Sequence, residues 1–404
     1  MKNLYNLPKK VFFCKLCVNS NQRPCSYPEF HHDRERKNAN YLNINNEGIC
    51  DACNVALQKN KINWKKREKE LLKLLDKNRK SNGDYDCIVP GSGGKDSMLA
   101  SYILKYEYDM NPLTVTWPPI LYTDYGYKNF LNWIEIGGFD NISFKQNGNV
   151  MKLLTKLSIQ NLLHPFQTFI LGQKNIGPII AEKFNISLIF YGENEAEYGN
   201  PKQDFNKSKR ENKYFTVKNY KNILLAGIPI KKLQSRYNLS LKDLKPFLPI
   251  LNNKNNKNLE VHYLGYYLKW IPQEAYYYAV EKCNFKPRPF RTQGTYSKYN
   301  SIDDKIDDLH YYTTFIKYGI GRTTSDASQE IRNKHITRDE AKRLVKKFDG
   351  EYPSIYLKEI LEYIDLNPSE FDKLCDSFRS PHLWKKTSRG YKLRHTVNKD
   401  GTDD

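Results

Sequence analysis

Long apolar runs are missing from this sequence of 404 residues, whose mean hydropathy is −0.75. No segment approaches the roughly 18 consecutive apolar residues that mark a membrane-spanning helix. The opening residues, Met1 to Tyr5, do not begin an apolar stretch with a small-residue cleavage site, so we expect no export signal. These absences predict a cytoplasmic protein that makes no contact with a membrane.

Acidic side chains are also in short supply. Asp and Glu number 45 against 65 Lys and Arg, which leaves a net charge of +20. Such an excess favours a polyanionic partner, namely a nucleic acid, an acidic membrane surface or a phosphorylated small molecule, although it also serves solubility. Charge alone therefore does not identify a nucleic-acid-binding protein. At roughly 100–200 residues per domain, the length suggests more than one domain.

Cysteines are few, and half of them are paired. A disulfide framework is unusual in a cytosolic chain of this length. Two Cys-x-x-Cys pairs offer four thiolates, which suits tetrahedral Zn²⁺ and leaves no open position for catalysis. We predict a structural zinc ribbon in residues 1–60, with an iron–sulfur cluster as the alternative. His31 and His32 are surplus as ligands and are expected to be solvated. The four predicted ligands are Cys14, Cys17, Cys50 and Cys53.

Strand and helix patterns alternate through the middle of the chain. Residues 61–84 predict an amphipathic helical connector. Residues 85–200 alternate strand, loop and helix, which predicts an α/β fold with right-handed βαβ units and a Rossmann-like parallel sheet. Residues 201–404 predict a mostly helical C-terminal module that binds substrate or partner. The predicted strands cover 85–89, 113–116, 142–144 and 186–191, and the predicted helices cover 97–106, 127–136, 151–159, 176–184, 303–318, 338–348 and 354–363.

The turn after the first predicted strand carries the strongest signal. Ligands of parallel sheets bind beyond the carboxyl ends of the strands, here after Val89, Thr116 and Tyr191. A Walker A loop is excluded, because Val89 occupies the place of its first glycine and Asp96 follows the lysine. Glycines let backbone N–H groups approach an anion, and the next helix points its positive end at the same place. We predict ATP binding by Gly91, Ser92, Gly93, Gly94, Lys95, Asp96 and Ser97, with Asp96 as a candidate Mg²⁺ ligand.

The hexapeptide Ser-Gly-Gly-Lys-Asp-Ser resembles the PP-loop of the ATP pyrophosphatase (adenine nucleotide α-hydrolase-like) superfamily. The resemblance implies cleavage of ATP between its α- and β-phosphates and transfer of AMP to a weakly electrophilic group. The stretch Tyr191 to Gly199 resembles the post-strand Gly-His-Asn segment of that superfamily, with Glu193 replacing histidine. A solvated acidic loop is the alternative for this stretch. The candidate catalytic residues are Lys95, Asp96, Glu193 and Glu197, and the further candidate nucleotide contacts are Thr116, Lys174, Gly192 and Asn194.

The whole set of motifs resembles the N-acetyl sugar amidotransferase family (PseA/WbpG type). The set adds His-Pro-Phe at 164–166 and Gly-Ile-Gly-Arg-Thr-Thr at 319–324 to the cysteine pairs and the hexapeptide. The resemblance implies conversion of an acetamido group to an acetamidino group on a CMP-linked pseudaminic or legionaminic acid or a UDP-linked sugar, for flagellin or lipopolysaccharide glycans. Arg322, Thr323 and Arg332 are candidates for substrate binding, and a helix-surface role is the alternative for the arginines. Arg338, after Thr337 and before Glu340, fits a capped helix start.

Ammonia for this reaction needs a source. No cysteine has the setting of a glutaminase nucleophile, so we expect a separate glutaminase subunit, as the family also implies, of the HisH-like type and with a HisF-like protein as a further candidate partner. A tRNA-modifying enzyme of the lysidine-synthase or thiolation type is the alternative function. Thiolation is disfavoured because no cysteine lies between Cys87 and Cys283. A lysidine-type ligase survives this test, although we do not expect a nucleic-acid partner.

Overall fold

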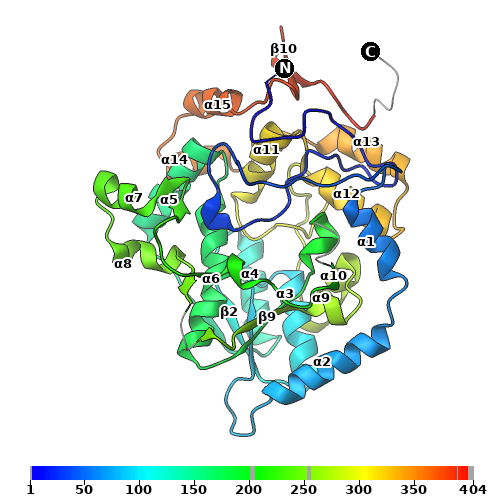
Figure 1. Ribbon diagram of the computed structural model, residues 1–404, viewed down its shortest axis with the longest axis vertical. Helices are drawn as coiled ribbons and strands as arrows, with labels where there is room; N and C mark the ends of the chain where they lie inside the picture. The colour runs from blue at the N-terminus through cyan, green and yellow to red at the C-terminus, as the bar shows by residue number, and fades with distance from the viewer. Residues whose placement is uncertain (1, 201–204, 253–255, 389, 399–404) are drawn as a thin grey trace.

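A five-stranded parallel sheet forms the centre of the molecule (Figure 1). The computed structural model describes residues 2–200, 205–252, 256–388 and 390–398. The strand order is β3-β2-β1-β4-β9, and each neighbouring pair runs in the same direction. The α/β class with a parallel central sheet is thereby confirmed. The strands are β1 (Cys87–Pro90), β2 (Pro112–Thr116), β3 (Asn141–Ser143), β4 (Leu188–Tyr191) and β9 (Glu260–Tyr263).

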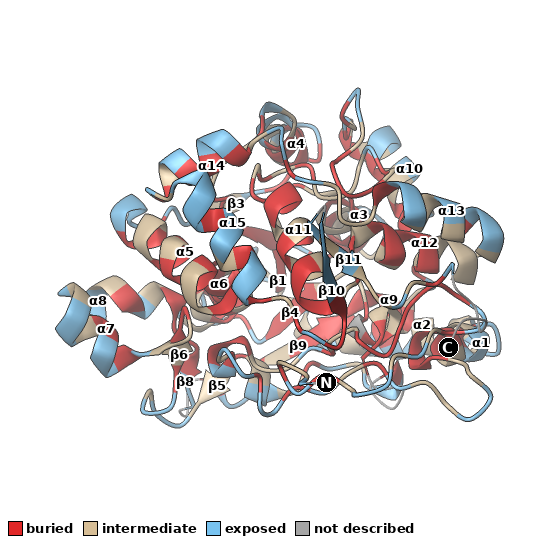
Figure 2. Ribbon diagram, turned by 90° about the horizontal axis from the view of Figure 1, so that it is seen from above, coloured by how far each residue is buried: buried red, intermediate tan, exposed pale blue. Residues whose placement is uncertain are grey.

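Both faces of the sheet are covered by helices. Successive strand residues point to opposite faces, so Ile88 joins one apolar cluster while Cys87 and Val89 join another. The Ile88 face packs against α5 (Gly148–Leu162) and α6 (Gln167–Lys183). Figure 2 shows the buried residues running through the middle of the molecule, with exposed residues on the outer helix faces. The other face packs against α2 (Trp64–Asn78), α3 (Lys95–Tyr102), α9 (Leu264–Tyr267) and α10 (Pro272–Cys283), and α4 (Asp124–Glu135) lies beside α3.

Several predicted helices begin at side-chain caps. The Asn63 side chain accepts the Lys66 N–H at the start of α2, which supports the helix expected in the connector. The capping box expected at Thr337 and Glu340 is present and begins α13 (Arg338–Phe348). These caps satisfy N–H groups that a helix end leaves without an internal partner. Sequence-local chemistry therefore fixes these two boundaries.

The sheet extends beyond the 85–200 range expected from the sequence. β9 pairs with β4 from Leu188↔Glu260 to Tyr191↔Tyr263, and α10 packs on α3. The sequence Glu-Val-His-Tyr lacks a continuous apolar run, which is why it gave no strand signal. The expected boundary after residue 200 adjoins residues 201–204, which lie outside the described residues.

The rest of the chain adds helices and short strand pairs. The N-terminal segment, dark blue in Figure 1, runs over the end of the molecule that holds α11, α12 and α13, and Val18 packs there with Ala327 and Ala341. No helix among the described residues has the length and apolarity needed to span a bilayer. The remaining helices are α1 (Asp51–Lys59), α7 (Ile230–Tyr237), α8 (Leu241–Leu244), α11 (Asp307–Tyr318), α12 (Arg322–Arg332), α14 (Leu357–Tyr363) and α15 (Pro368–Ser377). The remaining strands are β5 (Thr216–Val217), β6 (Leu224–Leu225), β7 (Ile228–Pro229), β8 (Ile250–Leu251), β10 (Trp384–Thr387) and β11 (Gly390–Leu393).

Candidate active site

A pocket of about 360 Å³ opens at the carboxyl ends of β1, β2 and β4. The strand order reverses between β1 and β4, since β2 and β3 lie on one side of β1 and β4 and β9 on the other. Ligands of open α/β sheets bind at such a reversal point, and small-molecule sites have volumes of about 300–1,000 Å³. The pocket is lined by Val89, Pro90, Gly91, Ser92, Gly94, Asp96, Ser97, Val115, Trp117, Ile170, Gln173, Lys174, Ile176, Tyr191, Gly192, Glu193, Tyr198 and Arg210.

The turn between β1 and α3 is shaped by its glycines. Gly93 has a φ of +84°, and a Cβ there would lie 2.6 Å from Phe130 Cα. A Cβ on Gly91 would lie 2.2 Å from Ser97 Cβ, so the chain can fold back this closely only with glycine. Gly94 is the N-cap of α3 and lines the pocket, as do Asp96 and Ser97 of the first helical turn. The N–H groups at this end of the helix therefore lie beside the pocket. This arrangement directs partial positive charge toward the pocket.

Three charged side chains gather at the start of α3. Lys95 Nζ donates to Asp96 Oδ2 at 2.6 Å and lies 4.0 Å from Glu193 Oε1. Trp270 Nε1 donates to the second oxygen, Asp96 Oδ1, at 3.2 Å. Burial, together with the nearby Asp96 carboxylate, raises the pKa of Glu193 to about 7. Glu193 can therefore change protonation state near neutral pH, which a general acid or base requires.

Eight residues expected from the sequence line this pocket, and others lie behind its wall. Lys95 is buried at its edge, with a side chain 7% exposed. The Thr116 hydroxyl accepts the Asn141 side-chain N–H, and the Asn194 side chain accepts the Ala196 N–H. These two residues therefore bond to the protein rather than line the pocket. The eight that do line it are Gly91, Ser92, Gly94, Asp96, Ser97, Lys174, Gly192 and Glu193.

Glu197 lies in a different pocket from Glu193. Lys59 Nζ donates to Glu197 Oε2 at 2.6 Å, and both side chains are largely buried. Arg332 donates to the Glu197 carbonyl at 3.1 Å, and Lys59, Glu197 and Arg332 line a separate pocket of about 210 Å³ on α1 and α12. The short 3₁₀ helix at 195–198 turns Glu197 away from Glu193. The sequence places the two carboxylates four residues apart, but the structure does not bring Glu197 to the first pocket.

The half-buried Arg322 and the buried Thr323 form their contacts within the C-terminal region. Arg322 Nε donates to Asp326 Oδ1 at 2.7 Å, and its guanidinium also donates to the Tyr311 hydroxyl at 2.9 Å. The Thr323 hydroxyl donates to the Gly294 carbonyl at 2.7 Å. Neither residue lines the first pocket. Their contacts are those of residues that hold α12 in place.

Besides the strand-end residue Tyr191, four polar or aromatic residues of the pocket were not expected from the sequence. Arg210 Nε donates to the Tyr263 hydroxyl at 3.0 Å, and its guanidinium lies 4.4 Å above the Tyr191 ring. No local motif marks Arg210, which reaches the site only because β9 joins the sheet. Trp117 directly follows β2, so the strand-end rule could have found it. The four residues are Trp117, Gln173, Tyr198 and Arg210.

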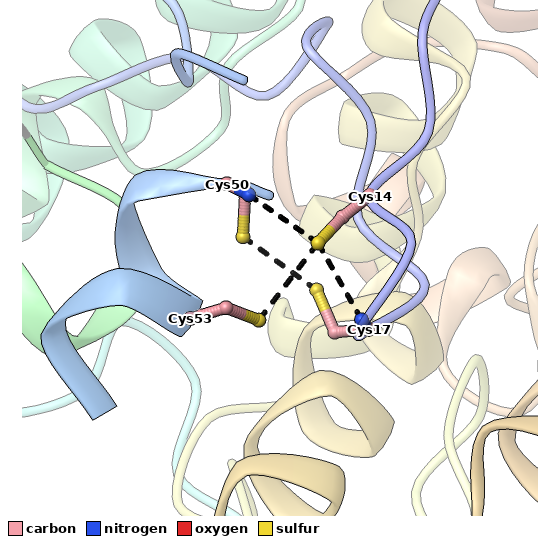
Figure 3. Close-up of side chains that lie close together, drawn as sticks. All are labelled: Cys14, Cys17, Cys50 and Cys53. Atoms are coloured by element: carbon pink, nitrogen blue, oxygen red, sulfur yellow. Dashed lines mark hydrogen bonds between the residues drawn. The ribbon is translucent and has the colours of Figure 1, made fainter. Parts of the chain in front are cut away.

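The four paired cysteines converge on one point (Figure 3). The sulfur atoms of Cys14 and Cys53 are 3.9 Å apart and those of Cys17 and Cys50 are 3.7 Å apart. A tetrahedral ion with bonds of about 2.3 Å separates its sulfur ligands by about 3.8 Å, so the spacing fits Zn²⁺. Arg338 of α13 donates to the carbonyls of Cys14 and Cys17 at 3.1 Å each. These two hydrogen bonds stabilise the turn that carries the first cysteine pair. The cluster is compatible with the expected zinc site.

His32 is buried, which corrects the expectation that it is solvated. Its Nδ1 lies 2.9 Å from Glu29 Oε1, and His164 Nε2 lies 3.2 Å from the same oxygen. Burial lowers the pKa of His32 to about 3. His31, by contrast, is exposed as expected. The buried group of Glu29, His32 and His164 connects the N-terminal segment to the His-Pro-Phe motif. Residue spacing in the sequence could not show this contact.

A comparison with models of protein families found a match in the C-terminal part of the chain. Residues 293–398 match the model described as "LPS biosynthesis protein WbpG-like, C-terminal domain". This segment is therefore similar to the C-terminal domain of WbpG-like proteins. The match supports the WbpG type among the families that the motifs resemble, and the matched residues include α11 to α15.

The chain is also similar to an archaeal protein. It is 32% identical over 102 residues to an uncharacterised protein of Methanocaldococcus jannaschii, MJ1599. The match covers 25% of this chain and 31% of that relative, so the chain spans less than a third of the relative's length.

Proposed function

We propose that this protein is an ATP-dependent, AMP-forming enzyme of lipopolysaccharide-type glycan biosynthesis. It converts the acetamido group of a nucleotide-linked N-acetyl sugar to an acetamidino group. The main support is a glycine turn with a buried lysine at the reversal point of a parallel sheet, in a chain whose C-terminal part is WbpG-like.

The reaction starts with a carbonyl that resists ammonia, because an amide is resonance-stabilised and hydroxide is a poor leaving group. The amide oxygen attacks the α-phosphorus of ATP, and pyrophosphate departs. Ammonia then adds to the resulting imidate carbon, the carbon–oxygen bond breaks, and AMP leaves with the former amide oxygen. Loss of a proton gives the amidine. Adenylation thus replaces hydroxide, a poor leaving group on the amide carbon, with AMP, a phosphate of low basicity.

The turn after β1 fits the departing pyrophosphate. Its backbone N–H groups and the positive end of α3 oppose the charge that grows as the bond breaks. Lys95, held between Asp96 and Glu193, adds a positive charge from the pocket edge. Asp96 retains acceptor capacity beside Lys95 and Trp270 and is the residue that would hold Mg²⁺, which when bound neutralises phosphate charge.

Glu193 is the proposed proton acceptor. Its raised pKa, about 7, places it near the pH at which it would receive the proton that the added nitrogen loses. The Glu193 side chain is a third exposed and lines the pocket beside the glycine turn. Glu197, already paired with Lys59, has no part in this proposal.

Ammonia is proposed to come from a separate glutaminase subunit. A cysteine nucleophile acts as the thiolate, and burial raises the pKa of Cys283 to about 12 and raises the pKa values of Cys87 and Cys375 as well. The buried Cys25 thiol donates to the Gly199 carbonyl at 3.3 Å.

The paired cysteines are proposed to hold a structural Zn²⁺ that connects the N-terminal segment to α1.

The test is a reconstituted reaction with ATP, Mg²⁺, ammonium chloride and either a CMP-linked N-acetyl sugar acid or a UDP-linked N-acetyl sugar. We expect AMP and pyrophosphate in equal amounts and a sugar product lighter by roughly one mass unit, because NH replaces O. Lys95→Ala is the control and should form both products about 10²–10³ times more slowly. Formation of ADP, or AMP release that needs tRNA instead of the sugar, would contradict the proposal.

A further inference from the structure

A second polar pocket, of about 220 Å³, lies next to the candidate nucleotide pocket. Ile170 and Lys174, one turn apart on α6, line both pockets, so the two spaces share one wall. Three parts of the chain enclose the second pocket, namely the N-terminal segment, the start of α6 and α11. A volume of about 220 Å³ is space for several waters or a small polar ligand.

The lining of this pocket carries more positive than negative groups. Arg36, Lys174 and Lys317 line it, whereas Glu29 is the one acidic side chain among the described residues that do. Lys317 Nζ donates to the Leu162 carbonyl at 2.7 Å. Burial and the charge of Arg36 lower the pKa of Lys317 well below its usual value, which disfavours the protonated amine until a counter-charge is added. An anionic ligand would supply one.

Imidazole nitrogens add unused hydrogen-bonding capacity. His164 and His310 stack with ring centroids 5.1 Å apart. His164 Nδ1 and His310 Nδ1 are buried and have no hydrogen-bond partner among the described residues. A buried polar atom without a partner is unfavourable, so these two nitrogens call for a hydrogen-bonding occupant of the pocket, either water or a ligand. Tyr27 and Tyr318 add aromatic surface to the same pocket, as sugar-binding sites often require.

A metal ion is the main competing occupant. The Glu29, His32 and His164 ligand atoms lie within 4.8 Å of one another, and a two-histidine, one-carboxylate set is a known zinc arrangement. The charge of Arg36, however, acts on both histidines from the same pocket and opposes a divalent cation there. The surplus of positive groups therefore favours an anion over a divalent metal.

We infer that this second pocket binds the anionic N-acetyl sugar substrate, with Lys317 and His310 facing its carboxylate or phosphate and Lys174 at the junction with ATP. This inference rests on the proposed function, since the substrate is the one named there. It would place the acetamido group toward the wall shared with the nucleotide pocket, and it assigns a use to the His-Pro-Phe motif. It also explains why α11, within the WbpG-like segment, contacts the N-terminal segment.

Calorimetric titration tests the inference with two separate ligands, ATP and CMP-N-acetylneuraminic acid. Lys317→Met and His310→Gln should each weaken binding of the sugar probe by about tenfold or more and leave ATP binding within about twofold. Lys156→Met, a change on the exposed side of α5, is the matched control and should alter neither. Two pocket variants are used because loss of the buried Lys317 could also lower stability, which circular dichroism will report.

The outcomes separate the inference from the proposed function. If the wild type binds ATP but not the sugar probe, or if both pocket variants bind the probe normally, the inference is wrong and the nucleotide assignment survives. If the wild type binds no ATP, the proposed function fails. A second bound zinc per chain by metal analysis, lost in His164→Gln, would overturn the inference in favour of a metal site.

Discussion

Glycine substitutions separate the structural role of the turn after β1 from its proposed contact with phosphate. Gly93 has a φ of +84°, and an added Cβ would lie 2.6 Å from Phe130 Cα and 2.8 Å from Phe130 N. A left-handed backbone destabilises alanine by about 1–2 kcal/mol, and forced repacking adds about 1–3 kcal/mol. We therefore expect Gly93→Ala to lower the free energy of unfolding by about 2–5 kcal/mol.

Gly94 provides the matched control. Its φ is −75°, and an added Cβ would meet only Ser92 Oγ, at 3.9 Å. Gly94→Ala should change the free energy of unfolding by about 1 kcal/mol or less, because weaker helix capping is offset by a stiffer unfolded chain. Since Gly94 lines the pocket, the added methyl should take space that a phosphate needs and weaken ATP binding by about tenfold or more.

Urea unfolding, followed by the fluorescence of the five tryptophans, measures stability, and calorimetry measures ATP binding. Gly93→Ala as stable as the wild type would refute the turn geometry. Gly94→Ala that binds ATP normally would refute the position assigned to the phosphates. The pair is informative because one substitution acts on the fold and its neighbour acts on the ligand.

Three further predictions use single changes. Lys95→Ala should lower kcat by about 10²–10³ with little change in the circular dichroism spectrum, because it removes charge stabilisation; unchanged turnover would exclude Lys95 from the site. The kcat of the wild type should rise with pH through about 7, as Glu193 loses its proton, and Glu193→Gln should abolish that rise and lower kcat by about 10²–10⁴; an unaltered pH profile would exclude Glu193 as the base. Cys50→Ser should remove bound zinc and lower the melting temperature, whereas Cys283→Ser should keep the metal; a zinc-loaded Cys50→Ser protein would contradict the four-thiolate site.

Local sequence patterns were sufficient to predict the strands that frame the first pocket. The strands β1, β2 and β4 lie where short apolar runs predicted them, and the helix Arg338–Phe348 has the predicted ends. The strand-end rule then located the turns that line the pocket, because the carboxyl ends of parallel strands meet at one edge. Glycine, serine and lysine in one short turn supplied a signal that needs no tertiary contact.

Residues that reach a site through distant contacts left no such signal. Arg210 enters the first pocket only because the short strand β9 joins the sheet, and Glu29 meets His164 only because the N-terminal segment crosses α6. Glu197 was predicted as a catalytic residue because it follows Glu193 in the same loop. In the structure it forms an ion pair with Lys59 of α1, which the spacing of residues in the sequence does not reveal. In each case a pairing of residues far apart in the chain decided the outcome.

The path of a single oxygen atom tests the account most directly. The protein is given ATP, ammonia and a nucleotide-linked sugar whose acetamido oxygen is ¹⁸O, and the AMP is analysed by mass spectrometry. If the amide oxygen is adenylated and then displaced by nitrogen, every AMP formed carries the label and the sugar loses it. Unlabelled AMP, or release of ADP and phosphate, would contradict the central claim.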